Sequence, residues 1–319
     1  MCSEGIVERY VNFYTDFAFK KLFGTEINKE LLISFLNALL HGREKIEDIT
    51  YLNAEHLGTQ EYDRRAVFDV YCKNEKGEHF IVEMQKGEQQ FFKDRSIYYS
   101  TFAIREQAPR GDWNYELKGI YTIGILNFSI YPDNTDFYHE VKLVDLATKE
   151  VFYDKLTFIY LEMPKFTKEE DKLETLFDKW LYAIRNLSTL MKRPEALQEK
   201  VFTRLFEAAE IAKFDRKERY EYEESLKNYR DWISVIETAE NKGAAKGHAK
   251  GLEEGHAKGL EEGHAKGLEE GKEIGRAEGV EMGEKKKAFA IARELKSMGV
   301  GIEIISRSTG LPMEEIERL

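Results

Sequence analysis

Between Tyr14 and Leu40 the hydrophobic positions recur at intervals of three and four residues, which predicts helical structure. Gly24 interrupts this pattern and is expected to separate two helices. The apolar stripe of the second helix consists of Leu31, Leu32, Phe35, Leu36, Leu39 and Leu40. Such a stripe is typical of a helix that packs against a core.

Apolar runs in the following region predict β-strands at residues 49–53, 67–73, 79–85, 119–128, 138–145 and 156–162. Residues 91–107, between the third and fourth strands, have the pattern of a helix. After Pro164 the strand pattern ends, and residues 171–190, 195–213 and 217–241 predict amphipathic helices. We therefore expect an α/β or α+β fold, with helices flanking a mixed central sheet and an all-helical C-terminal half.

The segment VFDVYCKNEKGEHFIVEMQ predicts a β-hairpin with a loop at residues 75–77, where Gly77 supplies the left-handed residue. One face of this hairpin then carries only apolar pairs, which are Phe68 with Met84, Val70 with Val82 and Cys72 with Phe80. On the other face Asp69 lies opposite Glu83, with ~5 Å between their Cβ atoms. Gln85 projects from that same face, two residues after Glu83.

Two carboxylates that face each other on a sheet repel, so a half-buried pair has to share a proton or bind a cation. Carboxylate oxygens favour Mg²⁺ or Mn²⁺ over zinc. Asp69 and Glu83 are therefore candidate metal ligands, and the Gln85 amide could orient a water or a phosphate oxygen. The structural alternative is a solvated strand face on which both carboxylates have lysine or arginine neighbours.

This region resembles the Rpn family of recombination-promoting nucleases and transposases, within the PD-(D/E)xK superfamily. The resemblance covers approximately residues 10–166 and rests on TDFAFKKLFG with LLISFLNALL, on FDVYCKNEKGEHFIVEMQ and on FFKDRSIYYSTF. It implies a restriction-endonuclease-like fold and a Mg²⁺-dependent (or Mn²⁺-dependent) endonuclease that acts on DNA. It also implies a link to recombination or mobile elements.

The resemblance assigns Asp69 and Glu83 to the metal-binding positions of the superfamily and Gln85 to the position of its lysine. Two residues depart from the pattern, because Phe68 stands where proline is expected and Gln85 replaces the lysine. A neutral amide cannot supply the positive charge of that lysine. A second metal, Lys86 or Arg95 could supply it instead.

Other residues of the same segments are weaker candidates. Asp16 matches the acidic position on the family's first helix, where it could approach the metal, although the helix dipole alone would favour an acid there. Arg95, Tyr98 and Tyr99 lie within one helical turn and could contact the phosphate backbone together with Lys86. The two tyrosines could equally pack in the core.

Composition narrows the class of protein. The chain has 42% hydrophobic residues, 5 prolines and two cysteines, which indicates a folded protein of a reducing cytoplasm. No segment approaches the ~18 apolar residues of a membrane span. The net charge of -11 disfavours a protein that coats nucleic acid through bulk electrostatics. The motifs of serine hydrolases and of phosphate-binding loops are absent from the sequence.

The octad GHAKGLEE occurs three times in succession between residues 247 and 270, and glycine recurs every fourth residue from Gly243 to Gly283. Each glycine costs a helix ~1 kcal/mol relative to alanine, so an exposed helix without contacts is not expected. The glycine row drifts ~40° per step, which does not encode a long coiled coil. Contacts within a homo-oligomer and a plain spacer both remain open. The three histidines are expected at the surface.

Residues 285–319 predict a helix, a break at residues 299–301, a short helix and a last helix that begins near Pro312. This spacing resembles a helix-turn-helix. Its last helix carries Glu314, Glu315 and Glu317, so a packing or partner-binding module is favoured over a reader of DNA bases.

Together these patterns predict a nuclease core at residues 1–166 and a helical region at 167–241. The repeat follows at 242–284 and the C-terminal module at 285–319. The expected function is that of a Mg²⁺-dependent endodeoxyribonuclease. The alternatives are a catalytically weakened nucleic-acid-binding or oligomeric adaptor, and a phage-defence or toxin-like nuclease.

Overall fold

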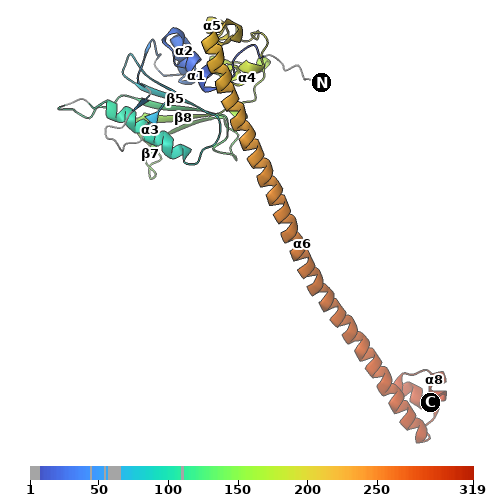
Figure 1. The fold of residues 1–319 in the computed structure, drawn as a ribbon. Helices are drawn as coiled ribbons and strands as arrows, with labels where there is room; N and C mark the ends of the chain where they lie inside the picture. The colour runs from blue at the N-terminus through green and yellow to red at the C-terminus, as the bar shows by residue number, and fades with distance from the viewer. Residues whose placement is uncertain (1–7, 44, 54, 57–65, 109–110) are drawn as a thin grey trace, which may run out of the picture. The chain divides into compact units, whose positions relative to one another are not determined.

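The computed structural model describes residues 8–43, 45–53, 55, 56, 66–108 and 111–319, with the backbone alone for 55, 56, 66 and 67 (Figure 1). The chain forms two compact units, Met1–Val235 and Ile236–Leu319. Every strand of the described ranges lies in the first unit.

A six-stranded mixed sheet with the order β1-β4-β5-β6-β8-β7 forms the centre of the first unit. Strands β5, β6 and β8 run parallel, and the other pairings are antiparallel. The sheet consists of β1 (Ile49–Tyr51), β4 (Val70–Asn74), β5 (His79–Gln85), β6 (Ile120–Leu126), β7 (Tyr138–Val144) and β8 (Val151–Glu162). A separate two-stranded pair consists of β2 (Glu55–His56) and β3 (Ala66–Val67).

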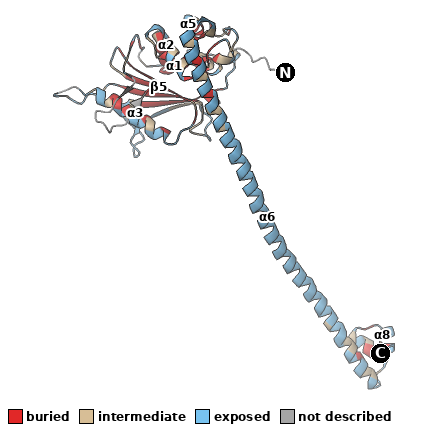
Figure 2. Cartoon of the chain, in the orientation of Figure 1, coloured by how far each residue is buried: buried red, intermediate tan, exposed pale blue. Residues whose placement is uncertain are grey.

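Helices flank this sheet, as the sequence predicts (Figure 2). On one face lie α1 (Asp16–Phe23), α2 (Lys29–Leu39), α4 (Leu176–Asn186), α5 (Lys200–Ala209) and the start of α6 (Arg216–Ser297). The other face is covered by α3 (Phe92–Glu106), which connects the parallel strands β5 and β6. Short 3-10 helices are η1 (Glu26–Asn28), η2 (Met163–Lys165), η3 (Glu170–Lys172), η4 (Leu187–Thr189) and η5 (Ile211–Lys213).

Local sequence determines where α1 begins and ends. The Thr15 hydroxyl accepts a hydrogen bond from the Ala18 N–H at 3.3 Å and caps the first turn. At the other end the Gly24 N–H donates to the Lys20 carbonyl at 2.8 Å. A Cβ at position 24 would lie 2.8 Å from that same carbonyl oxygen, so only glycine fits without a shift. Gly24 thus separates the first two helices, as predicted.

The hairpin of β4 and β5 has the predicted register. Val70 pairs with Val82 and Cys72 with Phe80, and these four side chains are buried in the main core. Gly77 has a φ of +81°, the left-handed conformation that the loop requires. Because the turn fixes the register, it also fixes which β5 side chains point towards α3.

Phe68 does not lie where the alternation of the strand predicts it. The chain bends at residues 68 and 69, and β4 begins only at Val70. Phe68 packs on the α3 face of the sheet, in a cluster with Tyr71 and Ile81, and its ring meets that of Tyr99 edge-on. The expected pairing of Phe68 with Met84 on the apolar face is therefore wrong, because the bend ends the two-residue periodicity.

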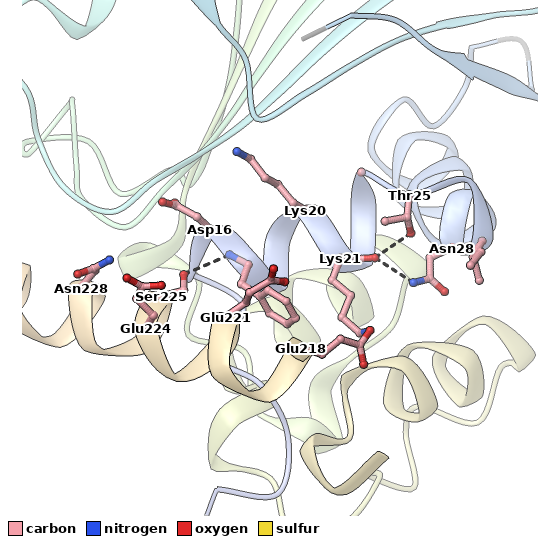
Figure 3. A pocket seen from close by; sticks show the side chains of 13 residues that line it. Asp16, Lys20, Lys21, Thr25, Asn28, Glu218, Glu221, Glu224, Ser225 and Asn228 are labelled. Atoms are coloured by element: carbon pink, nitrogen blue, oxygen red, sulfur yellow. Dashed lines mark hydrogen bonds and ion pairs between the residues drawn. The ribbon is translucent and has the colours of Figure 1, made fainter. Parts of the chain in front are cut away.

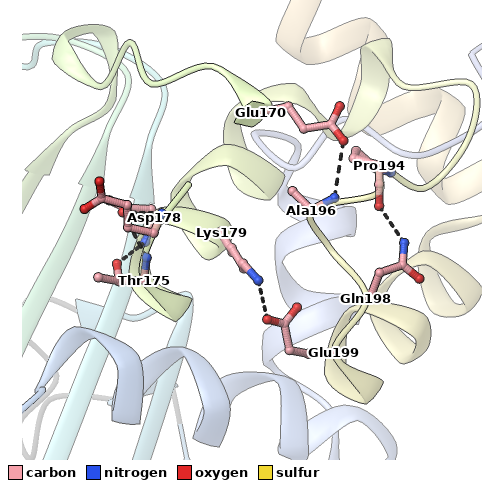
Figure 4. A network of polar contacts seen from close by, with 9 residues as sticks. Glu170, Thr175, Asp178, Lys179, Pro194, Ala196, Gln198 and Glu199 are labelled. Carbon is pink, nitrogen blue, oxygen red and sulfur yellow. Dashed lines mark hydrogen bonds and ion pairs between the residues drawn. The ribbon is translucent and has the colours of Figure 1, made fainter. Parts of the chain in front are cut away.

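Polar contacts fix the segment that connects α4 and α5 (Figure 4). The Thr175 hydroxyl accepts a hydrogen bond from the Asp178 N–H at 3.0 Å, and the Asp178 carboxylate accepts one from the Thr175 N–H at 3.1 Å. This reciprocal capping box defines the start of α4. An ion pair between Lys179 and Glu199 then joins α4 to the residue that precedes α5. These contacts define the start of α4 and connect it to the start of α5.

In the second unit α6 continues as a helix through the repeat, although an exposed helix without contacts was not expected. Residues 237–282 are exposed, including the three repeat histidines, and a Cβ on any glycine from Gly243 to Gly283 would meet nothing within 4 Å. The expectation is wrong for the single chain. The helical hydrogen bonds close within the segment, and the intervening Ala, Leu, Lys and Glu favour helix. No helix of the described ranges is long and apolar enough to cross a membrane.

The end of the chain packs as three helical segments, as predicted. After α6 come α7 (Ile302–Thr309) and α8 (Met313–Glu317). Gly299 and Gly310 both have positive φ and form the two breaks. A small core joins the segments and consists of Ala292, Ile305, Leu311 and Ile316.

Replacing Gly255 and Gly259 by alanine is expected to stabilise the helix by ~1 kcal/mol per site, because both positions face open space. Circular dichroism of the double variant should show a higher helix content and a higher midpoint of thermal unfolding. Gly310→Ala is the matched control and should destabilise the tail, since φ is +72° there. A double variant with less helix than the wild type would contradict the expectation and indicate that another chain covers the glycines.

Candidate active site

A cavity of about 350 Å³ lies at the carboxyl end of β5. Residues from β5, α3, α1 and α6 contribute to its wall. It contains all the residues that the sequence proposes for the site except Tyr98, namely Asp16, Asp69, Glu83, Gln85, Lys86, Arg95 and Tyr99. Gly87 and Trp232 also line it and were not predicted.

The bend before β4 positions Asp69. Its carboxylate accepts a hydrogen bond from the Met84 N–H at 2.9 Å, so it bridges to β5 at the point where the two strands separate. Burial raises the pKa of this carboxyl, and the negative charge of Asp16 raises it further. The Met84 N–H and the charges of Lys20 and Lys86 act in the opposite direction.

Glu83 is almost fully buried, with 6% of its surface exposed. Burial raises its pKa to about 8, and the negative charge of Asp69 adds to the effect. The positive charge of Arg95 opposes both. The predicted conflict between the two carboxylates is therefore present, and without a cation Glu83 retains its proton at neutral pH.

Gln85 links Glu83 to Arg95 of α3 through two hydrogen bonds. Its amide nitrogen donates to the Glu83 carboxylate at 3.2 Å, and its amide oxygen accepts from the guanidinium of Arg95. Arg95 also donates to Gln89, and its buried Nε has no hydrogen-bond partner among the described residues. Gln85 thus orients a cationic side chain towards the carboxylates without carrying a charge itself.

Asp16 and Lys86 form an ion pair of 3.0 Å, and both side chains line the cavity. Asp16 is the first residue of α1, where the helix dipole favours a carboxylate, and 64% of its side chain is exposed. The structure therefore brings Asp16 close to the carboxylate pair and also supplies the purely structural reason for an acid at this position.

The two tyrosines of α3 have different surroundings. Tyr99 lines the cavity and packs its ring edge-on against Phe68, with 5.0 Å between the centroids. Tyr98 is 44% exposed and packs against Phe102 outside the cavity. Of the pair, only Tyr99 is placed to contact a group bound near Glu83.

Four lining residues are not among those that the sequence proposes for the site, namely Met84, Gly87, Gln89 and Trp232. Trp232 is the largest of them. It comes from the first turns of α6, far along the chain from the hairpin. A Cβ at position 87 would lie 1.8 Å from the Cη2 atom of Trp232, so the indole occupies space that only glycine leaves open. One signal was available, because Trp232 follows Tyr222, Ser225 and Tyr229 on a single helical face.

A second cavity of about 680 Å³ lies between α1 and α6, and Asp16 lines both cavities (Figure 3). The two helices are fixed side by side by an ion pair between Lys21 and Glu218 and by a 3.2 Å hydrogen bond from the Phe17 N–H to Ser225. Its charged lining residues are four acids and two lysines, and Glu221 and Glu224 are exposed on α6.

The carboxylates fit a divalent cation. Asp69 and Glu83 both offer oxygen atoms, and a bound cation would remove the repulsion that raises the pKa of Glu83. Within the described ranges, no cluster of three or more His, Cys, Asp or Glu side chains is arranged to hold a metal. A metal here would thus have two carboxylate ligands and, as is usual for Mg²⁺, several waters.

Without metal, the free energy of unfolding is expected to fall as the pH rises from about 5 to about 8. The folded protein keeps the Glu83 proton up to a pKa of about 8, whereas the unfolded chain releases it near the ordinary pKa of ~4.3. The amide side chain of the Glu83→Gln variant cannot ionise, so the stability of this variant relative to the wild type should rise by ~3–4 kcal/mol between pH 5 and pH 8. Urea unfolding in the presence of a chelator at both pH values measures this rise. An identical pH dependence in the two proteins would contradict this expectation.

The family model described as PD-(D/E)XK nuclease family transposase matches residues 13–239. This span includes the whole sheet and every residue that lines the smaller cavity. Neither the curated proteins nor the solved structures contain a match to the chain. The matched span is well over half of the chain and confirms the superfamily that the sequence indicated. The chain belongs to the PD-(D/E)XK nuclease family transposases.

Proposed function

We propose that this protein is a metal-dependent endonuclease that hydrolyses phosphodiester bonds of DNA. The observation that carries the proposal is the pair of the half-buried Asp69 and the buried Glu83, which line a cavity with Arg95 in its wall. Two raised carboxyl pKa values in one cleft mark a functional site more often than a structural one. The description of the family as transposases supports a role in DNA rearrangement.

Asp69 and Glu83 would hold the cation. A divalent metal bound there would polarise a phosphate oxygen and lower the pKa of a water that attacks phosphorus. The Met84 N–H holds Asp69, and the Gln85 amide holds Glu83, so both side chains are oriented before substrate arrives. Mg²⁺ and Mn²⁺ suit these oxygen ligands.

Arg95 would supply the positive charge that the superfamily places on a lysine. Its guanidinium lies in the cavity wall, is oriented by Gln85, and has a buried N–H without a partner in the described ranges. A fixed cation near the developing negative charge of the phosphoryl group stabilises the transition state. Lys86 and Tyr99 line the same wall and would contact the phosphate backbone.

Asp69→Ala and Glu83→Ala should each lower the rate of plasmid nicking by about 100-fold or more, since each removes a metal ligand. The assay compares the purified variants with the wild type in Mg²⁺ and in Mn²⁺. A chelator should abolish nicking by the wild type. If the wild type and both variants nick equally, or none nicks, the nuclease proposal is wrong. The second outcome would favour a nucleic-acid-binding adaptor.

Arg95→Ala should lower kcat by about 100-fold with a smaller change in KM, because the charge acts mainly in the transition state. Adding Gln85→Lys to this variant should recover part of kcat, since it restores a cation at the superfamily position. Arg105→Ala is the matched control, because Arg105 is exposed near the end of the same helix. An unchanged kcat in Arg95→Ala would refute the assignment.

A further inference from the structure

Trp232 is a half-buried aromatic residue in the wall of a cavity that otherwise contains mainly charged and polar side chains. Its ring lies against Gly87, two residues beyond Gln85, so it is close to the end of β5 that carries Glu83. The proposed scissile phosphate would bind beside Glu83. A planar aromatic surface at this place is within reach of the nucleotide attached to that phosphate.

The helix that carries Trp232 is fixed to the segment that precedes α1. Tyr229, one turn earlier, stacks on Tyr14 with an interplanar angle of 12°, and the Tyr222 hydroxyl accepts a hydrogen bond from the Asn12 N–H at 3.0 Å. Both tyrosines are buried. Trp232 is therefore held as part of the cavity wall and needs no rearrangement to meet a ligand.

Trp232 makes no hydrogen bond and no ring contact with the described residues. Trp180 provides the contrast, since its indole donates to Ser34 at 3.1 Å and its ring contacts Phe35 and Phe202. A tryptophan in a core is usually satisfied in this way. The unpartnered indole at the cavity is better suited to contact a ligand than to stabilise the fold.

We propose that Trp232 stacks on an unpaired nucleobase next to the scissile phosphate, which makes single-stranded DNA, or DNA with an unpaired base, the preferred substrate. In a duplex both faces of each base are covered by neighbouring bases, so an indole reaches a base only after it has left the stack. Stacking on an aromatic side chain contributes about 1–3 kcal/mol per base. This inference rests on the proposed nuclease function, but its test does not depend on cleavage.

The test is the binding of a short fluorescently labelled DNA strand to the full chain, compared with the duplex of the same sequence, in the presence of a chelator. Trp232→Leu should weaken binding of the single strand by about 5-fold to 100-fold, whereas Trp232→Phe should retain most of it. Trp113→Leu is the matched control and should bind as the wild type does. Binding of the duplex should be weaker than that of the strand and unaffected by either change at Trp232.

Fluorescence of Trp232 gives a second measurement that does not require its replacement. A Trp113→Phe background retains two tryptophans, Trp232 and the fully buried Trp180. The single strand should quench the part of the emission that comes from Trp232, because a stacked base quenches an indole. Equal binding of the strand by Trp232→Leu and the wild type would overturn the inference. The inference would also be overturned if Trp232→Leu lost affinity equally for strand and duplex, or if the strand caused no quenching.

The two proposals fail separately. If the wild type cleaves no DNA but strand binding depends on Trp232, the hydrolysis proposal falls and the base-stacking site stands. If the wild type cleaves DNA and Trp232→Leu binds and cleaves strand and duplex as the wild type does, the nuclease proposal stands and the base-stacking site falls.

Discussion

The site of the first unit depends on one constraint, the burial of the Glu83 carboxyl beside the negative charge of the half-buried Asp69. Burial and proximity raise the pKa of Glu83 to about 8, and the side chains around it reduce this cost. The Met84 N–H donates a hydrogen bond to Asp69, and the Gln85 amide oxygen accepts one from the guanidinium of Arg95, which keeps this positive charge near Glu83. A fold that needed only stability would replace the pair by apolar residues. Its presence at an open cavity is best explained by chemistry.

The sequence predicted correctly those elements whose structure is determined by residues close together in the chain. Gly77 fixed the turn, the turn fixed the pairing of β4 with β5, and Gly24 separated two helices. Asp69 and Glu83 could therefore be proposed as candidate metal ligands from their spacing together with the family resemblance. Phe68 shows where this reasoning stops, because a bend is not visible in a run of alternating residues.

Trp232 could not be placed from the sequence for a different reason. Its neighbour Gly87 is remote along the chain, and helical periodicity shows which face of α6 is buried but not what covers it. The exposed repeat was misjudged because the helix cost of glycine was weighed without the hydrogen bonds that a continuous helix closes within itself. Propensity alone favours neither a spacer nor an interface for this segment.

The contact of Trp232 with Gly87 joins the cavity wall to a part of the chain that lies well beyond the sheet. All the proposed metal ligands lie before Phe166, yet the wall of their cavity is completed by a residue of α6, and the matched family span ends shortly after it, at residue 239. A fragment that stopped at the end of the sheet would carry every ligand but would leave one side of the cavity open to water. The cavity wall and the family match therefore both extend beyond the sheet into α6.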